Sequence, residues 1–138
     1  FTKDHYIDKL MRISTDGDWT GWIEYCLNGV ILQSLDAQHR CSRLLKLKDD
    51  YHKQLSTSKH AGLITQLVDD LFTSPIMTVS YVTKNYPVSG PTARNYLDTL
   101  VKLGFLQEIR LRKRRQKGYV CKDIFEITYD DPLWVKTG

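Results

Sequence analysis

A chain of 138 residues, 41% hydrophobic and 26% charged, is typical of a soluble globular protein with one domain or two small ones. No apolar run approaches the roughly 20 residues that cross a bilayer, which excludes a membrane-spanning helix, and we expect no membrane partner. The net charge of +4 is modest, but residues 110–117 contain six Lys and Arg. Such a local excess indicates a binding face.

Cysteine usage indicates a reducing compartment. Cys26, Cys41 and Cys121 are odd in number and widely spaced, which argues against a disulfide framework and against a zinc site. Residues 1–5 do not resemble a signal peptide. We therefore expect a cytoplasmic protein whose first residue lies inside a longer chain.

The first half of the chain is predicted to be helical. Residues 1–13 form one helix, and the Thr-Asp-Gly-Asp sequence at 15–18 breaks it and offers a cap for the next. That next helix has an apolar stripe at helical spacing. We predict that Trp19 and Trp22 are core residues, because two large aromatic side chains need a deep apolar partner, and that Cys26 is a small buried hydrophobe. The stripe consists of Trp19, Trp22, Ile23, Cys26, Leu27, Val30 and Ile31.

The second helix has no proline between Trp19 and Ser56. If it is unbroken, it is about 57 Å long at about 1.5 Å per residue. A break near Asp36 or Ser42 is the alternative.

Residues 17–30 resemble part of a known family. Gly17-Asp18-Trp19 is followed after two residues by Trp22-Ile23, then by Tyr25-Cys26-Leu27 and Gly29-Val30. This segment resembles the end of the core of Fic-domain proteins, where a GDW-x-x-W segment with an aromatic-rich continuation follows the catalytic motif. Tyr6 and Leu10 fall where the family has a preceding tyrosine-bearing helix. Tyr25-Cys26 departs from the family, in which two phenylalanines are common.

The resemblance implies that the chain is part of a larger enzyme. Fic enzymes transfer AMP from ATP to a hydroxyl side chain, and their HPFxxGNGRxGR-like motif supplies a histidine base and a glycine-rich phosphate loop. None of the four histidines, His5, His39, His52 and His60, is followed by such a loop. The chain therefore resembles the C-terminal part of a Fic protein, with no catalytic residue and no cofactor of its own. ATP and Mg²⁺ are implied only for the full-length parent, a protein adenylyltransferase. Many bacterial members end in a winged helix.

The polar residues 56–60 separate a helical region, residues 1–58, from a second domain, residues 59–138. In this domain we predict helices at residues 62–72 and at about 78–85, the latter capped by Thr78.

A third helix begins after Ser89, which can cap it. Pro91 fits its first turn and Gly104 is its natural stop.

Strands are predicted on both sides of a basic loop. Residues 105–112 are rich in strand formers, and Gln116-Lys117-Gly118 can turn. The return strand is predicted from residues 119–121 and 124–127. The order helix, helix, helix, strand, loop, strand predicts a winged helix-turn-helix, and the fold class is mainly α with a small β wing.

The third helix and the wing supply the candidate nucleic-acid contacts. Helix-turn-helix proteins place the N-terminal part of this helix in the major groove, where Arg94 could contact guanine and Asn95 adenine. The alternative is a solvated helix face, because Asp98 on the same face would oppose phosphate. The wing, with its clustered Lys and Arg, can lie along phosphates or enter a minor groove, and the alternative is a hairpin tip kept soluble by charge. The candidate residues are Ser89, Thr92, Arg94, Asn95, Arg110, Arg112, Lys113, Arg114, Arg115 and Lys117.

No enzymatic or metal site is predicted in this chain. His39 and His52 lack a pattern of carboxylates around them, and the adjacent pairs Asp49-Asp50 and Asp69-Asp70 point in different directions on a helix. The sequence therefore predicts a non-catalytic C-terminal module that binds DNA. The alternative is a protein-interaction or dimerisation module that positions the Fic core or recruits its target.

Overall fold

The computed structural model describes residues 2–56, 62–110 and 117–129. The chain divides into two compact units, with residues up to Cys41 in the first and Ser42–Asp130 in the second. None of the helices in the described part of the chain is long and apolar enough to cross a membrane. The predicted basic residues Arg112, Lys113, Arg114 and Arg115 lie outside the described residues.

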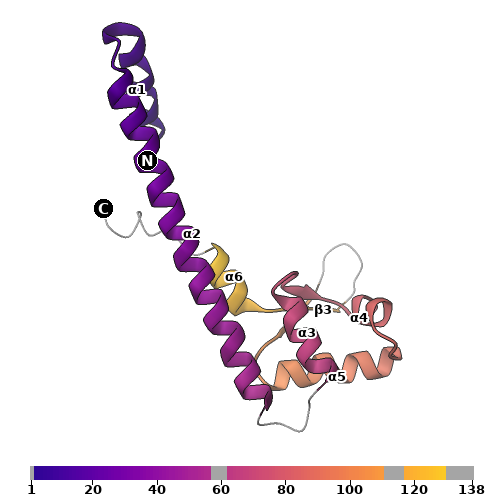
Figure 1. Ribbon diagram of the computed structural model, residues 1–138. Helices are drawn as coiled ribbons and strands as arrows, with labels where there is room; N and C mark the ends of the chain where they lie inside the picture. The colour runs from indigo at the N-terminus through magenta and orange to yellow at the C-terminus, as the bar shows by residue number, and fades with distance from the viewer. Residues whose placement is uncertain (1, 57–61, 111–116, 130–138) are drawn as a thin grey trace. The chain divides into compact units, whose positions relative to one another are not determined.

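The first unit is a helical hairpin. Helix α1 (Lys3–Asp16) is followed by helix α2 (Trp19–Ser56), and the two run in opposite directions (Figure 1). Gly17 makes the turn with a φ of +66°, a conformation that favours glycine, and the Asp18 carboxylate accepts a hydrogen bond from the Gly21 N–H at 2.9 Å. The predicted break between the helices is therefore confirmed.

Aromatic side chains of the hairpin pack against one another. Tyr6 meets Trp22 edge to face at 5.4 Å between ring centroids, and His5 stacks on Tyr25 at 6.0 Å. Trp19 is 61% exposed and Cys26 is also exposed, so the prediction that they are buried is wrong for this chain. Helical periodicity identified the apolar face correctly, but among the described residues the second helix of the hairpin does not cover it.

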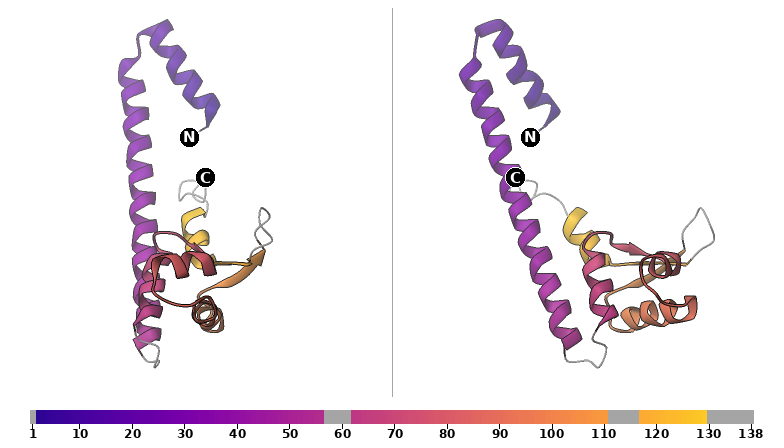
Figure 2. Two further views of the ribbon diagram at one scale, coloured as in Figure 1. Left: turned by 90° about the vertical axis from the view of Figure 1, so that its right-hand side faces the viewer. Right: turned by 45° about the vertical axis from the view of Figure 1, so that its right-hand side comes forward.

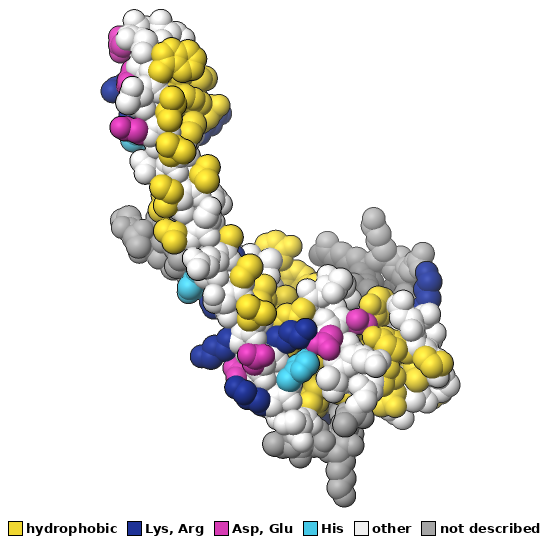
Figure 3. Space-filling model, in the orientation of Figure 1, with side chains coloured by type: hydrophobic (Ala, Val, Ile, Leu, Met, Phe, Trp, Pro, Cys, Tyr) yellow, Lys and Arg dark blue, Asp and Glu magenta, His cyan; other side chains and the backbone are white. Residues whose placement is uncertain are grey.

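An apolar face therefore runs along this hairpin (Figure 3). It is formed by large side chains that each remain at least two-fifths exposed. We call it the apolar hairpin face, and it comprises Tyr6, Ile7, Leu10, Met11, Trp19, Ile23, Leu27, Val30, Ile31 and Leu35.

Helix α2 is continuous for 38 residues. The structure has no break near Asp36 or Ser42. Asp36 is instead a buried carboxylate that accepts a hydrogen bond from Arg40 Nε at 2.7 Å, one turn further along the helix. An i,i+4 pair of this kind supports an uninterrupted helix.

The second unit is mainly helical with a small three-stranded antiparallel sheet, which confirms this part of the predicted fold class. After the last turns of α2 come α3 (Leu63–Leu71), β1 (Ile76–Met77), α4 (Val79–Asn85), α5 (Gly90–Lys102), β2 (Gln107–Arg110), β3 (Lys117–Val120) and α6 (Lys122–Tyr129). The strand order is β1-β3-β2. The β2–β3 hairpin projects away from α2 (Figure 2).

The core of this unit joins every helix to the sheet. Leu67, Val82, Leu97 and Leu100 are fully buried, and Tyr119 of β3 is 1% exposed. The end of α2 contributes Tyr51 and Leu55 to the same core. These apolar contacts hold the helices in place around the small sheet.

Two predictions about the β region are wrong, and one strand was missed. Residues 124–127 form part of helix α6 rather than a strand, because Ile124 and Ile127 are both buried and are spaced one helical turn apart. Lys117 and Gly118 lie in β3 rather than in a turn. Strand β1 was not predicted, and its pairing of Ile76 with Val120 depends on a partner far along the chain.

Candidate nucleic-acid interface

Local capping fixes the start of α5, where four candidate residues lie. Ser89 is the N-cap, since its hydroxyl accepts a hydrogen bond from the Thr92 N–H at 3.4 Å, and the two hydroxyl oxygens lie 2.8 Å apart. Pro91 occupies the first turn. Ala93, Leu97 and Leu100 are fully buried on the inner face of the helix. The N-cap predicted from the sequence is confirmed.

Arg94 and Asn95 are exposed on the outer side of this helix. They line a shallow cleft of about 340 Å³ together with Gly90 and Pro91 of α5 and Val79, the first residue of α4. A guanidinium and an amide in an open cleft can each make paired hydrogen bonds to a planar ligand edge.

The second group of candidate residues lies on the β2–β3 hairpin. The antiparallel register places Glu108 opposite Tyr119 and Arg110 opposite Lys117. Because side chains alternate along a strand and directly opposed residues share a face, all four project from the same face of the sheet. Arg110 is exposed at the end of β2. Two like charges directly opposite each other repel, which favours an anion beside them.

One hydrogen bond joins this face of the hairpin to α5. The Tyr119 hydroxyl donates to Asp98 Oδ1 at 3.2 Å. Asp98 is therefore part of the link between helix and sheet rather than an isolated acid. Since Tyr119 shares its face with Arg110 and Lys117, these two cations lie on the face of the sheet that is turned towards α5.

The charges around Tyr119 act on its acidity. Burial raises the pKa of Tyr119, and the neighbouring carboxylates of Asp98 and Glu108 raise it further. The Arg94 guanidinium acts in the opposite direction. Arg94 lies one helical turn before Asp98, on the same side of α5. Because Asp98 is hydrogen-bonded to Tyr119, the two groups of candidate residues belong to one surface. We call it the α5–hairpin surface, and its described members are Arg94, Asn95, Asp98, Glu108, Arg110, Lys117 and Tyr119.

Lys117 forms an ion pair with Glu108. Its Nζ lies 2.8 Å from Glu108 Oε1, and the two side chains are 62% and 44% exposed. Glu108 and Tyr119 were not predicted to be part of the site. Strand alternation puts Glu108 on the same face as Arg110, but the register that brings it to Lys117 depends on the hairpin pairing.

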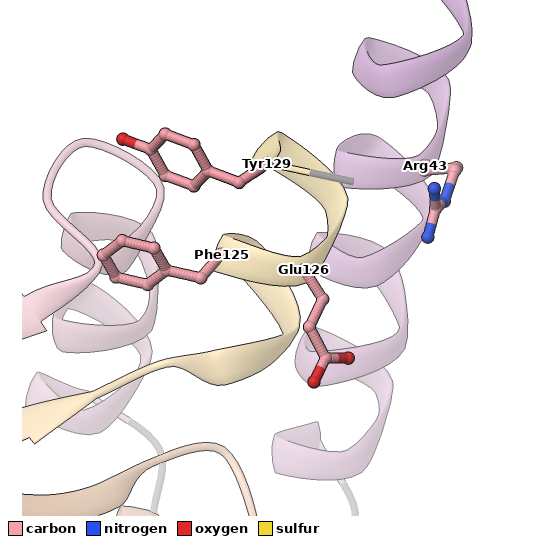
Figure 4. Close-up of a pocket in the computed structure, with 4 residues that line it drawn as sticks. All are labelled: Arg43, Phe125, Glu126 and Tyr129. Carbon is pink, nitrogen blue, oxygen red and sulfur yellow. The ribbon is translucent and has the colours of Figure 1, made fainter. Parts of the chain in front are cut away.

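A separate hollow lies on α6, away from all the predicted residues. It has a volume of about 800 Å³ and is lined by Arg43, Phe125, Glu126 and Tyr129 (Figure 4). Phe125 and Tyr129 stack at 5.5 Å on one side of α6, while Glu126 points from another side. Of the described lining residues, Arg43 and Glu126 do not point toward one another in the view of Figure 4.

The buried polar groups of the second unit have structural partners. The Tyr51 hydroxyl donates to Asp123 Oδ2 at 2.7 Å and lies 3.5 Å from Cys121 Sγ. Burial raises the pKa of both Tyr51 and Cys121, so the thiol stays protonated and is a poor nucleophile. Within the described ranges, no group of three His, Cys, Asp or Glu side chains could hold a metal ion.

Comparison with known proteins does not add an assignment. No family model matches the sequence, and no curated protein is significantly similar to it.

Proposed function

We propose that the Ser42–Asp130 unit is a winged helix-turn-helix domain that binds duplex DNA. In this proposal α4 and α5 form the helix-turn-helix, and the β2–β3 hairpin is the wing. The observation that carries it is the α5–hairpin surface, in which the exposed start of α5 and the basic face of the hairpin are joined through Tyr119 and Asp98.

The candidate residues of the hairpin and those of α5 differ in chemistry and would make different contacts with DNA. Arg110, Lys117 and the basic residues between them would contact phosphates and supply most of the affinity, independently of sequence. Arg94 and Asn95 would supply any sequence preference, since Arg pairs well with guanine and Asn with adenine in the major groove. No step in this proposal requires a cofactor in this chain.

The test is a titration of a random DNA duplex followed by fluorescence anisotropy at several salt concentrations. We expect replacement of Arg112, Arg114 and Arg115 by Ala to weaken binding and to reduce the slope of log K against log salt by about 0.9 for each phosphate that the variant no longer neutralises. A matched control replaces the exposed helical residues Lys3, Lys46 and Lys53 by Ala and removes the same charge. Equal effects of the two triple variants would remove the wing from the DNA interface.

We further propose that the chain is the C-terminal part of a Fic-type protein. The Gly17-Asp18-Trp19 and Trp22-Ile23 segments support this, and so does the apolar hairpin face, which the rest of a helical core would cover. The parent would be an adenylyltransferase that uses ATP and Mg²⁺. An HPFxxGNGR-like motif shortly upstream of Phe1 is the expected finding, and an upstream sequence without it would contradict this part of the proposal.

A second candidate function is a protein-interaction or dimerisation module. The apolar hairpin face favours it, because large exposed apolar surfaces mark protein contacts. A gel shift with random duplex at about 50 mM salt, together with light scattering, separates the two candidates. A stable dimer that causes no shift would favour the interaction module.

A further inference from the structure

The pairing of Glu108 with Lys117 places an internal competitor on the α5–hairpin surface. The 2.8 Å contact joins neighbouring strands diagonally, since Arg110 is directly opposite Lys117 and Glu108 is directly opposite Tyr119. In the protein without DNA, Glu108 therefore forms an ion pair with Lys117. Together Glu108, Arg110 and Lys117 carry one net positive charge instead of the two that their cations alone would supply.

We propose that Glu108 is an affinity-setting residue, which lowers the affinity of the surface for phosphates in general by holding Lys117. This inference rests on the proposed DNA-binding function. A phosphate that takes Lys117 has to displace the Glu108 carboxylate and then lies close to it. Only a nucleic acid that makes enough other contacts with the protein compensates for the free energy lost when Glu108 is displaced from Lys117.

The physical effect is on the phosphate term, which specific and non-specific binding share. Non-specific affinity comes almost entirely from phosphate contacts, whereas base contacts from α5 do not depend on Lys117. A carboxylate beside the phosphate-binding cation therefore weakens the phosphate term and leaves the base-reading term unchanged. Asp98, which accepts a hydrogen bond from Tyr119, adds a second negative charge to the same surface.

The first test compares Glu108→Gln with Glu126→Gln, an exposed glutamate on α6 that serves as the charge-matched control. We expect Glu108→Gln to bind random duplex about two- to fivefold more tightly at about 50 mM salt, the range expected for one exposed ion pair. The slope of log K against log salt should steepen by up to about 0.9. Glu126→Gln should leave both quantities unchanged.

The second test places the same change in a Lys117→Gln background. If Glu108 acts through Lys117, the gain from Glu108→Gln disappears when Lys117 is absent. Thermal unfolding of all variants checks the fold, which the exposed positions of both side chains should leave intact.

The outcomes separate the inference from the function on which it rests. Wild-type binding without a gain in Glu108→Gln, or a gain of the same size in the Lys117→Gln background, overturns the role of Glu108 alone. A wild-type protein that does not bind duplex at low salt overturns the proposed function and this inference together.

Discussion

Asp70 connects three segments of the second unit through a single oxygen. Its Oδ2 accepts hydrogen bonds from the Tyr86 hydroxyl at 2.6 Å and from the Tyr81 hydroxyl at 3.2 Å. Tyr81 lies in α4 and Tyr86 ends it, so the carboxylate on α3 holds α4 and the turn that leads to α5. Burial raises the pKa of Tyr86, and the hydrogen bond to Asp70 raises it further, which keeps the hydroxyl a donor at neutral pH.

We expect Asp70→Asn to lower the free energy of unfolding by about 1–3 kcal/mol, because both tyrosines lose a charged acceptor. Urea unfolding at pH 7 measures the change. Asp49→Asn, an exposed carboxylate on α2, is the matched control and should change stability by less than about 0.5 kcal/mol. In a Tyr86→Phe background the cost of Asp70→Asn should be smaller, and an undiminished cost would show that the hydrogen bond to Tyr86 does not contribute.

At the scale of the element, α5 ends in a conformation that requires glycine. Gly104 has a φ of +83°, its N–H donates to the Val101 carbonyl at 3.0 Å, and Phe105 N–H donates to Leu100 O at 3.0 Å. This end turns the chain directly into the buried residue Phe105 and then into β2. The angle between α5 and the hairpin therefore depends on this residue.

Gly104→Ala should destabilise the protein by about 1 kcal/mol, because the left-handed conformation is unfavourable for an L-residue. Gly90→Ala is the matched control: it lies in the first turn of the same helix, a Cβ there would meet nothing within 4 Å, and it should be neutral or slightly stabilising. Thermal unfolding of the two variants checks the difference. Equal melting temperatures would contradict the role given to Gly104.

The elements that could be predicted are those whose signals are local. Ser89, Pro91 and Gly104 mark the ends of α5 within the segment itself, and Thr78 marks the start of α4 in the same way. Strand β1 could not be predicted, because two residues form a strand only where β3 supplies a partner.

Helix α6 was predicted as a strand for a related reason. Ile124, Phe125 and Ile127 are good strand formers, and their helical conformation depends on burying two of them against the core. In the candidate site, the exposed cations were predictable from composition. The Lys117–Glu108 contact and the link through Tyr119 depend on register, which the sequence alone did not specify.

At the scale of the whole molecule, the apolar hairpin face is the largest departure from what an isolated globular chain should show. We expect this chain, purified alone, to self-associate in a concentration-dependent manner through that face. Replacing Ile23 and Val30 by Glu should reduce the association measured by light scattering, because two charges would have to be buried in the contact. Glu at Asn28 and Gln33, exposed positions of the same helix, adds the same charge and should leave the association unchanged.

Tyr51 has a consequence for how the proposed DNA-binding domain can be moved between proteins. Its ring stacks on Phe105 at 4.0 Å and its hydroxyl reaches Asp123, so a residue of α2 fills a place in the core between the start of the wing and α6. The sequence places the domain from residue 59, but such a fragment would leave that place empty. A portable unit has to carry the last turns of α2 with it. Fusion partners are therefore joined to a helix rather than to a flexible linker, and natural recombination at this position would exchange the domain together with its helical stem.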